Sequence, residues 1–249
     1  MSDPAVSPTR VGNLLLGALP PVEFKRLAPH LKCVTLRVGQ ILKEADEPAL
    51  DVYFPLNAVI SLITVMENGM TLECGVVGRE GVVGLSAFLG GGPTPNQQLV
   101  QVPGTALKLP GSIMAHEYKR GGRLQELLST YTLATLIQIS QSVACNRIHS
   151  AEERLCRWLL MMSDRADTVY FPHTQEFLAQ MLGAARPVVT TAAGALQKAG
   201  LIKYSRGNLT ILNRTGLESA SCECYAKVAV EFDRLLGGNH ADAGAKDAD

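Results

Sequence analysis

Short apolar runs separated by turn residues dominate residues 33–110. Runs such as CVTLRV, DVYFPL, AVISLITVM and QQLVQV alternate with breaks that contain glycine, asparagine or proline. Many short strands at regular spacing are typical of antiparallel barrels and sandwiches. Asn68-Gly69 lies between two of these runs and gives the clearest hairpin signal. We therefore predict an α+β protein whose first domain is an antiparallel, jelly-roll-like β-barrel.

Helical patterns precede and follow this strand-rich region. Residues 13–31 contain two short helical pieces that are broken at Pro20-Pro21, and residues 121–148 form a longer segment with apolar positions on more than one face. A helix that is apolar on two faces must be covered on both. We expect one face to pack on the barrel and the other on a second copy of the chain, with burial inside one subunit as the alternative. The predicted dimerisation residues are Leu124, Leu127, Leu128, Tyr131, Ala134 and Gln138.

Residues 174–202 have the pattern of two short helices joined by a tight turn. Thr174 is a suitable N-cap, because its hydroxyl can accept a backbone N–H of the first turn. Gly183 can adopt the left-handed conformation that ends a helix, and Pro187 suits the first turn of the next helix. The order of these parts predicts a helix-turn-helix.

A β-ribbon is predicted directly after this motif. Apolar segments cover 201–204 and 209–212, and Gly207-Asn208 is the predicted turn between them. A helix-turn-helix with such a wing places one helix in the DNA major groove; an ordinary helical hairpin followed by a β-hairpin is the alternative. Upstream, the SAEE sequence of Ser150–Glu153 has the pattern of a capping box and predicts the start of a further helix.

Positive charge is concentrated in the same part of the chain. Residues 173–214 contain five basic residues and one acidic residue, Glu176, so that 5 − 1 gives +4. Residues 1–120 hold ten residues of each sign, and the whole chain has a net charge of zero. A DNA phosphate backbone attracts a local excess of Lys and Arg. The charge pattern therefore favours DNA binding over an ordinary hairpin.

The other patterns divide the chain and indicate its compartment. No apolar run approaches the ~18–20 residues of a membrane span, and the N-terminus has no basic start followed by an apolar core. We expect a cytoplasmic protein that does not enter a membrane. The predicted parts are a disordered N-terminus over 1–12, a β-barrel domain over 13–120, a dimerisation helix over 121–148, a winged helix-turn-helix over 149–236 and a disordered tail over 237–249.

The six cysteines are scattered and are expected to be free thiols in a reducing cytoplasm. Cys222 and Cys224 are the only close pair. On a continuous helix over 216–235 they would point to different faces and make a poor metal clamp. The five histidines show no ligand spacing. We therefore expect these cysteines to be helix-packing residues, with a thiol sensor or metal site as the alternative, and predict no metal and no cofactor.

The order of barrel, long helix, capped helix and winged helix-turn-helix resembles the Crp/Fnr family of bacterial transcription regulators. The resemblance covers residues 13–236, and its strongest points are VYFPLNAVISLITVMENGMTLECGVVGREGVVGL, AEERLCRWLL and TQEFLAQMLGAARPVVTTAAGALQKAGLI. It implies a cyclic-nucleotide-binding-like barrel, dimerisation through the long helix, and binding to pseudo-palindromic sites. The implied partners are double-stranded DNA, a second copy of the chain and RNA polymerase, while the effector stays unidentified.

The chain departs from family members that bind cyclic AMP. Those members carry a glutamate beside a glycine for the ribose and an Arg-Ser or Arg-Thr pair for the cyclic phosphate. Here Leu85 follows Gly84, and the segment 93–98 (PTPNQQ) has no arginine. Because an anionic phosphate buried without a cation is costly, we expect no response to cyclic AMP. The candidate effector-pocket residues are Gly84, Leu85, Ser86, Gln97 and Gln98.

The second helix of the motif also differs from that of the cyclic-AMP receptor. The resemblance matches Arg186 with a family arginine, whereas Pro187 replaces a glutamate and Thr191 replaces a second arginine. Arg186 can donate to guanine O6 and N7 or hold a phosphate. We predict base contacts from Arg186, Thr190 and Thr191. The predicted phosphate contacts come from Thr174, Gln175, Lys203, Ser205 and Arg206.

Two other function classes compete with a dimeric DNA-binding regulator. One is a small-molecule or redox sensor that acts mainly through protein partners, with the winged domain as a protein-binding platform; this class would be favoured if the wing had no basic excess. The other is an enzyme, but the sequence has no nucleophile–base–acid set, no HExxH motif, no P-loop and no dinucleotide fingerprint. The observed basic excess favours DNA binding, and we predict a regulator without enzymatic activity.

Overall fold

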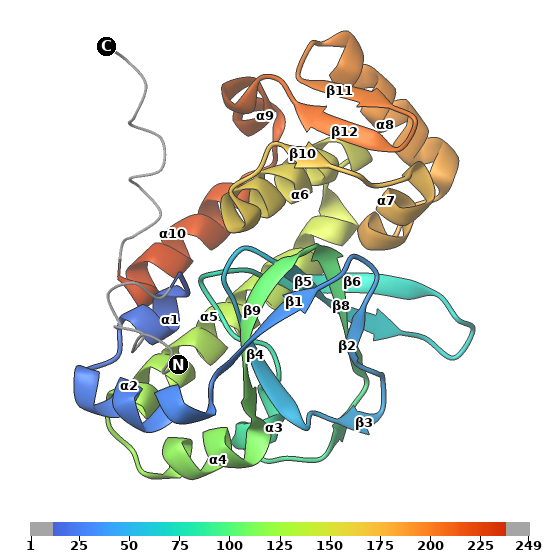
Figure 1. The fold of residues 1–249 in the computed structure, drawn as a ribbon. Helices are drawn as coiled ribbons and strands as arrows, with labels where there is room; N and C mark the ends of the chain where they lie inside the picture. The colour runs from blue at the N-terminus through green and yellow to red at the C-terminus, as the bar shows by residue number, and fades with distance from the viewer. Residues whose placement is uncertain (1–11, 238–249) are drawn as a thin grey trace, which may run out of the picture. The chain divides into compact units, whose positions relative to one another are not determined.

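The structure is a computed structural model that describes residues 12–237 (Figure 1). The chain divides into two compact units. The first holds the residues up to Ser129 together with Arg165–Asp167, and the second holds Thr130–Asp164 and the residues from Thr168 onward. The predicted disordered termini, 1–12 and 237–249, lie outside the described residues except for Gly12 and Gly237.

Antiparallel sheets form the centre of the first unit. One sheet has the strand order β1-β9-β4, a second has the order β2-β8-β5-β6, and β3 pairs with β7. The strands are β1 (Lys32–Leu36), β2 (Ile41–Lys43), β3 (Glu47–Pro48), β4 (Asp51–Pro55), β5 (Val59–Val65), β6 (Thr71–Val77), β7 (Pro93–Thr94), β8 (Asn96–Val102) and β9 (Gly104–Pro110). The antiparallel α+β class is thus confirmed, although the strands lie in separate sheets and do not close into one barrel.

The hairpin between β5 and β6 has the turn that the sequence predicts. Gly69 has a φ of 80°, a left-handed conformation that favours glycine. Its N–H donates to the carbonyl oxygen of Met66 at 2.8 Å. β5 also pairs with β8, so it lies in the middle of its sheet. The buried side chains of the sheets include Val52, Phe54, Ile60, Ile63, Val76, Val100 and Leu109.

Short helices complete the first unit. They are α1 (Leu14–Gly17), α2 (Pro21–Leu27), the 3-10 helix η2 (Ala28–His30), α3 (Ser86–Leu89) and α4 (Gly111–Lys119). The predicted break at Pro20-Pro21 is confirmed, because Pro21 begins α2 where its missing N–H costs little. Asn13 caps α1, and its amide donates to the carbonyl oxygens of Pro55 at 3.0 Å and Gly81 at 2.9 Å. This buried side chain fastens α1 to the sheets.

The long helix α5 (Arg123–Ile148) begins two residues later than predicted, because Gly121 and Gly122 both have positive φ. The Glu23 carboxylate accepts the backbone N–H groups of Arg123 at 3.1 Å and Leu124 at 2.8 Å. A carboxylate at this end of a helix satisfies orphan N–H groups and complements the helix dipole. The start of α5 is therefore fixed by a side chain of α2.

Burial within one chain distinguishes the row of α5 that we predicted as the dimer face from a second, exposed row. All six predicted dimerisation residues are buried within one chain: Leu124, Leu127, Leu128, Tyr131, Ala134 and Gln138. Leu133, Leu136 and Val143 are exposed instead, with 47%, 57% and 68% of their surface accessible. Together with Ser140 they repeat every three or four residues and form one face of the helix, which we call the α5 stripe. Periodicity alone could not tell which apolar row of α5 is buried and which is exposed, because both rows have apolar residues at similar spacing.

The second unit contains the predicted helix-turn-helix. α6 (Ala151–Ala166) starts at the capping box, where Ser150 N donates to Glu153 Oε2 at 2.8 Å and Glu153 N donates to Ser150 Oγ at 3.3 Å. The next elements are β10 (Tyr170–Phe171), α7 (Gln175–Leu182), α8 (Arg186–Lys198), β11 (Ile202–Ser205), β12 (Asn208–Ile211), α9 (Arg214–Ala220) and α10 (Cys224–Leu236). The three strands form a sheet with the order β10-β12-β11.

The continuous helix that we predicted over 216–235 is wrong. α9 ends at Ala220 and α10 begins at Cys224. Ser221 is extended, with φ −80° and ψ 158°, and this conformation ends α9. Cys222 lies in the break and Cys224 opens the next helix, and both are buried. The two cysteines therefore do not lie on different faces of one continuous helix, as we had predicted.

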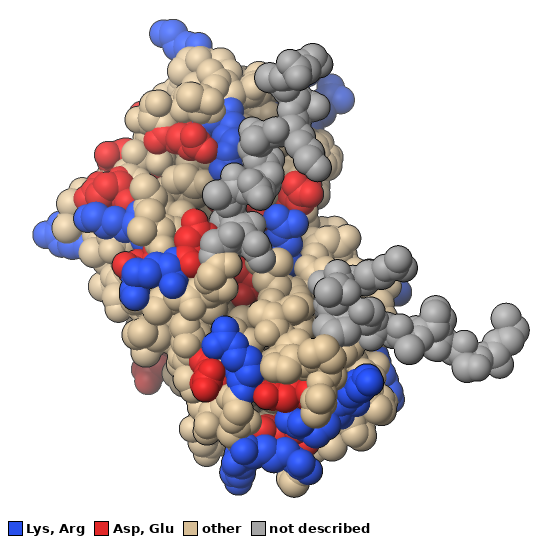
Figure 2. All heavy atoms as spheres, turned by 90° about the vertical axis from the view of Figure 1, so that its left-hand side faces the viewer, with Lys and Arg blue, Asp and Glu red and all other residues tan. Residues whose placement is uncertain are grey.

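Charges of both signs are interspersed on the face drawn in Figure 2. In the first unit, Arg26 pairs with Glu117 at 2.7 Å and Lys108 pairs with Asp51 at 2.6 Å. Such pairing contrasts with the basic excess of the segment 173–214. Among the helices of residues 12–237, none has the length and apolar character that a membrane span requires.

Candidate DNA-binding surface

The helix-turn-helix has the local geometry that its sequence predicts. Thr174 caps α7, and its Oγ1 accepts the backbone N–H of Phe177 at 3.2 Å. Gly183 ends α7 in the left-handed conformation, with φ 56° and ψ 39°. Pro187 lies in the first turn of α8. A short turn that depends on glycine therefore sets the direction in which α8 leaves α7.

The apolar side chains of α7 and α8 hold the motif together and leave one face of α8 outside. The buried residues are Leu178, Met181 and Leu182 of α7 and Val189, Ala192, Ala193 and Leu196 of α8. Arg186, Pro187, Thr190 and Thr191 are exposed at the start of α8. Burial of the opposite face therefore presents the predicted base-reading residues to solvent.

An aromatic cluster supports the segment that leads into α7. The His173 ring stacks on Phe177 with centroids 4.5 Å apart and meets Trp158 edge-on at 5.7 Å. Burial lowers the pKa of His173 to about 4. Its imidazole is therefore neutral near pH 7 and serves as a packing group in front of the Thr174 cap.

The tip of the wing is Arg206-Gly207, one residue earlier than predicted. Ser205 pairs with Asn208, and the two residues between them have φ values of 51° and 78°. Positive φ at both central positions is the pattern of a type I′ turn. A non-glycine residue with positive φ is uncommon, which is why Gly207-Asn208 was the stronger sequence signal. The shift places the Arg206 side chain at the tip of the hairpin.

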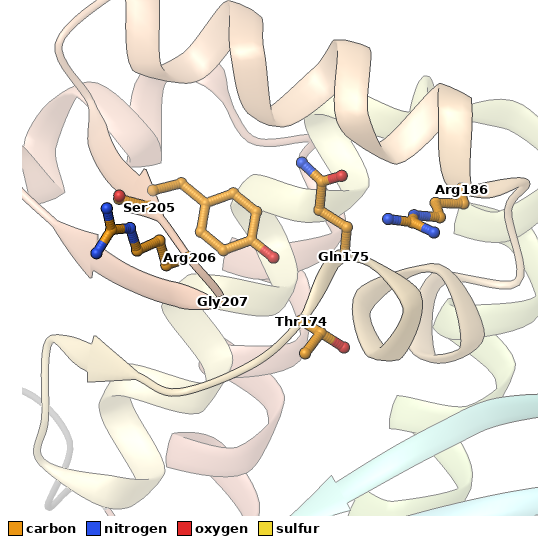
Figure 3. Close-up of a pocket in the computed structure, with 7 residues that line it drawn as sticks. Thr174, Gln175, Arg186, Ser205, Arg206 and Gly207 are labelled. Carbon is orange, nitrogen blue, oxygen red and sulfur yellow. The ribbon is translucent and has the colours of Figure 1, made fainter.

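Residues from α7, α8 and the wing line one open concavity of about 320 Å³ (Figure 3). In this view Gln175 lies between Arg186, which comes from the start of α8, and Arg206, which comes from the wing. The lining residues are Thr174, Gln175, Arg186, Tyr204, Ser205, Arg206 and Gly207. Five of our eight predicted DNA-contacting residues are among them, while Thr190, Thr191 and Lys203 are exposed outside the lining.

The Arg186 guanidinium is held only weakly inside the protein. Its Nε lies 3.9 Å from Glu176 Oε2, which exceeds hydrogen-bond distance. Both side chains are about two-thirds exposed, at 65% and 64%. Exposed pairs of this kind contribute little to stability. The guanidinium can therefore turn toward a ligand at the concavity at small energetic cost.

The two threonines of α8 use their hydroxyl protons inside the protein. Thr190 Oγ1 donates to Gln175 Oε1 at 2.8 Å and also lies 3.0 Å from the carbonyl oxygen of Arg186. Thr191 Oγ1 donates to the carbonyl oxygen of Pro187 at 3.0 Å. A hydroxyl has one proton and two lone pairs. Both threonines therefore present an acceptor and a methyl group to a partner.

Tyr204 connects the wing to the two helices, and the sequence analysis missed it. Its backbone N–H donates to Gln197 Oε1 at 2.7 Å, and its hydroxyl donates to the carbonyl oxygen of His173 at 2.9 Å. Burial raises the pKa of Tyr204, which keeps the hydroxyl protonated as a donor. The sequence did contain a signal for Tyr204. β11 alternates between a buried Ile202 and an exposed Lys203, so Tyr204 lies on the same side of the strand as Ile202.

Arg214 does not contribute free positive charge to this surface. Its guanidinium lies 2.7 Å from Asp164 Oδ1 and 2.9 Å from Glu218 Oε1. The basic excess of the segment 173–214 therefore rests on its other four cations. They are Arg186, Lys198, Lys203 and Arg206.

The candidate effector-pocket residues lie on two separate elements of the first unit. Gly84, Leu85 and Ser86 are at the start of α3, and Gln97 and Gln98 are on β8. Gly84 has a φ of 94°, and an added Cβ would lie 2.6 Å from the carbonyl oxygen of Asp51. This glycine therefore has a structural role. Gln97 Nε2 donates to Glu44 Oε2 at 2.8 Å, and Gln98 is buried.

A buried lysine lies beside the segment 93–98. Lys43 Nζ donates to the carbonyl oxygens of Glu44 at 2.9 Å, Thr94 at 2.9 Å and Asn96 at 2.7 Å. An ammonium group has three N–H donors, so these carbonyls use all of them. Burial lowers the pKa of Lys43. This cation therefore stabilises the loop and has no remaining donor for a phosphate.

Comparisons with known proteins point to one kind of domain and one fold. Residues 153–220 match the family model described as a Crp-like helix-turn-helix domain. The fold is similar to that of FixK2 from Bradyrhizobium japonicum, with 16% identity over 77% of this chain and 98% of that one and a TM-score of 0.65. No curated protein matches the sequence significantly.

Two further solved structures show the same likeness. The global regulator CLP from Xanthomonas campestris, described as responsive to c-di-GMP, shares 13% identity over 77% of this chain and 99% of that one, with a TM-score of 0.63. A transcriptional regulator of the CRP family from Thermus thermophilus shares 16% identity over 76% of this chain and 96% of that one, also with a TM-score of 0.63. At these identities the likeness shows the fold.

Proposed function

We propose that this chain, which has the fold and the helix-turn-helix domain of Crp/Fnr-type transcription regulators, binds pseudo-palindromic DNA sites as a dimer and does not respond to cyclic AMP. One observation carries the DNA-binding part of this proposal. The exposed start of α8 and the tip of the wing flank a single concavity, with Arg186 on one element and Arg206 on the other. A reading helix and a basic wing side by side suit a major groove and its adjacent phosphates.

The proposed division of contacts follows from position and chemistry. Arg186 reads a guanine edge through two N–H donors, and the methyl groups of the exposed Thr190 and Thr191 suit thymine. Thr174, Gln175, Lys203, Ser205 and Arg206 surround the start of α8 and hold phosphates, which fixes the position of α8 on the duplex. Tyr204 keeps the wing in place through its bonds to Gln197 and His173.

Arg206→Ala is expected to weaken binding to specific and random duplexes by a similar factor, because a phosphate contact carries no sequence information. The slope of log K against log salt should become shallower by about one unit. Fluorescence anisotropy with labelled duplexes across a salt series measures both effects. Arg214→Ala is unsuitable as a control because of its ion pairs, so Lys25→Ala in the first unit provides the matched loss of charge. An unchanged salt slope in Arg206→Ala would remove Arg206 from the phosphate contacts.

A dimer is proposed through the α5 stripe. Leu133, Leu136 and Val143 form an exposed apolar row on a helix of 26 residues. When Ser140 is included, neighbouring members of the row are three or four positions apart. This spacing allows two helices to pack along a seam. Two copies would place two α8 helices on one duplex about one turn apart. The proposal keeps α5 as the dimerisation helix and changes the face that it uses.

Among its described residues, the first unit lacks a free cationic side chain at the segment where a cyclic phosphate would be expected to bind. The segment 93–98 has no arginine, and Lys43 has spent its three donors on carbonyl oxygens. A carboxylate also occupies the polar cluster on β5, β6 and β8, where Glu73 accepts hydrogen bonds from Ser61 and from Gln101 at 2.6 Å. An anion brought to this cluster would meet another anion.

Isothermal titration calorimetry with cyclic AMP and cyclic GMP is therefore expected to show no binding at micromolar concentrations. The same preparation must bind duplex DNA, which controls for correct folding. Micromolar binding of either nucleotide would contradict the proposed lack of response. It would also require a cation outside the segment 93–98 to hold the phosphate.

The alternative function, a sensor that acts mainly through protein partners, has less support. It is favoured when the wing lacks positive charge, whereas here the wing carries Lys203 and Arg206 on exposed positions. We also propose that the protein is not an enzyme. The concavity of the second unit is lined by hydrogen-bonding and cationic side chains, which suit the binding of a ligand.

A further inference from the structure

Four side chains that can ligate a metal converge beside the helix-turn-helix domain. Cys145 and His149 are four residues apart at the end of α5, so they lie on one side of that helix. Cys222 and Cys224 come from the break between α9 and α10. The three cysteines are buried and His149 is partly exposed. Spacing in the sequence concealed this group, because its two halves are separated by the 72 residues from 150 to 221.

The donor atoms have the spacing of ligands around a single ion. All four lie within 4.8 Å of one another. Cys145 Sγ is 3.5 Å from Cys222 Sγ, and Cys224 Sγ is 3.5 Å from His149 Nδ1. Two sulfurs at about 2.3 Å from a tetrahedral zinc ion lie about 3.8 Å apart. Small movements of these side chains would therefore complete a tetrahedron.

Outer contacts orient the ligands in the way that metal sites use. His149 points Nδ1 toward the cysteines, while its Nε2 lies 3.1 Å from Glu223 Oε2. A carboxylate on the second ring nitrogen fixes the ring and increases its basicity as a ligand. Gln141 Nε2 donates to Cys224 Sγ at 3.0 Å, a contact that stabilises a thiolate.

The local charge also suits a metal thiolate. Three thiolates, a neutral imidazole and a divalent ion sum to −1. Arg154 and Arg157 of α6 interact electrostatically with Cys145. The Nε atoms of both arginines are buried and lack an acceptor among the described residues. Two cations facing the group would balance the excess negative charge of the complex.

We infer that Cys145, His149, Cys222 and Cys224 form a structural Zn²⁺ site. Thiolate and imidazole ligands select zinc over magnesium and calcium, which prefer oxygen. Four protein ligands leave no open position, as in structural sites. A cluster of several iron atoms would need its ligands further apart than one ion does. Binding displaces the thiol protons into solvent, so each cysteine becomes a thiolate ligand.

The site would join the two ends of the DNA-binding domain. Cys145 and His149 precede the matched segment 153–220, and Cys222 and Cys224 follow it. An ion held by all four residues links segments that are far apart in the sequence. Because zinc binds the folded state, it also stabilises that state by mass action.

The test measures metal in the full chain, purified with a thiol reductant and dialysed against Zn²⁺. Elemental analysis should find about one zinc per chain, and Cys222→Ser and His149→Asn should each lower this by at least half. Cys33→Ser is the matched control, because Cys33 is an exposed free cysteine on β1; it should keep the wild-type zinc content. Thermal unfolding should shift downward with a chelator in the wild type and in Cys33→Ser.

Cobalt provides a readout that does not require the variants to fold. Co²⁺ added to metal-free wild type should give the intense visible and near-ultraviolet bands of tetrahedral thiolate coordination, and Zn²⁺ should abolish them. A wild type that takes up no zinc and gives no such bands would overturn the inference. So would a folded His149→Asn or Cys222→Ser variant with full zinc content.

Discussion

Arg186→Ala is expected to reduce specific DNA affinity by about 1–3 kcal/mol, or roughly 5- to 150-fold, while leaving most of the affinity for random duplex intact. This expectation follows from the position of the Arg186 side chain in the structure. It lies at the exposed start of α8, where its Nε is 3.9 Å from Glu176 Oε2. A bidentate contact to guanine O6 and N7 is lost when the guanidinium is removed. Competition binding with specific and random duplexes at one salt concentration measures the change.

Lys198→Ala is the matched control for this prediction. It removes one positive charge from the same helix, but at its C-terminal end. Its ratio of specific to random affinity should stay close to that of the wild type. Arg186→Lys should retain charge and lose part of the ratio, because an ammonium cannot reproduce the two-pronged geometry of the guanidinium. Equal ratios in wild type and Arg186→Ala would remove Arg186 from base reading.

Leu136→Glu is expected to convert the protein to a monomer and to lower its affinity for a full DNA site by about 10²- to 10⁴-fold. Leu136 is 57% exposed in the middle of the α5 stripe, so glutamate there has little effect on the fold of one chain. In a dimer, two copies of the new carboxylate would face each other in an apolar seam. Loss of the second half-site contact removes the gain from effective concentration.

Sedimentation velocity measures the oligomeric state, and circular dichroism confirms that the variant is folded. Leu50→Glu is the control, since Leu50 is also an exposed leucine but belongs to the segment between β3 and β4 and not to α5; this variant should remain dimeric. Tyr131→Glu would not discriminate, because Tyr131 is buried within one chain and its replacement would unfold the domain. A Leu136→Glu variant that remains dimeric would exclude the α5 stripe as the interface.

Local signals in the sequence predicted the helix-turn-helix well. Thr174, Gly183 and Pro187 each act through their own backbone or side-chain chemistry, so their roles do not depend on distant parts of the chain. The capping box at Ser150–Glu153 is of the same kind. These positions behave as predicted because capping, left-handed φ and proline at a helix start are short-range effects.

Features that depend on tertiary packing were harder to predict. The burial of Leu127 and Ala134 within one chain was not foreseen, because apolar spacing does not tell which row of α5 the subunit itself covers. The wing tip was placed at Gly207-Asn208, since an arginine with positive φ has no clear sequence signal. The cysteine–histidine group was missed because its halves meet only after α9 and α10 break at Ser221.

Selection of bound sequences from a random duplex library is the most direct test of dimeric, sequence-specific DNA binding. With the wild type, we predict two inverted half-sites whose centres lie about 10–10.5 base pairs apart, with a guanine in each half-site for Arg186. Enrichment of a single unpaired motif would contradict the dimer. No enrichment over the starting library would contradict specific DNA binding itself.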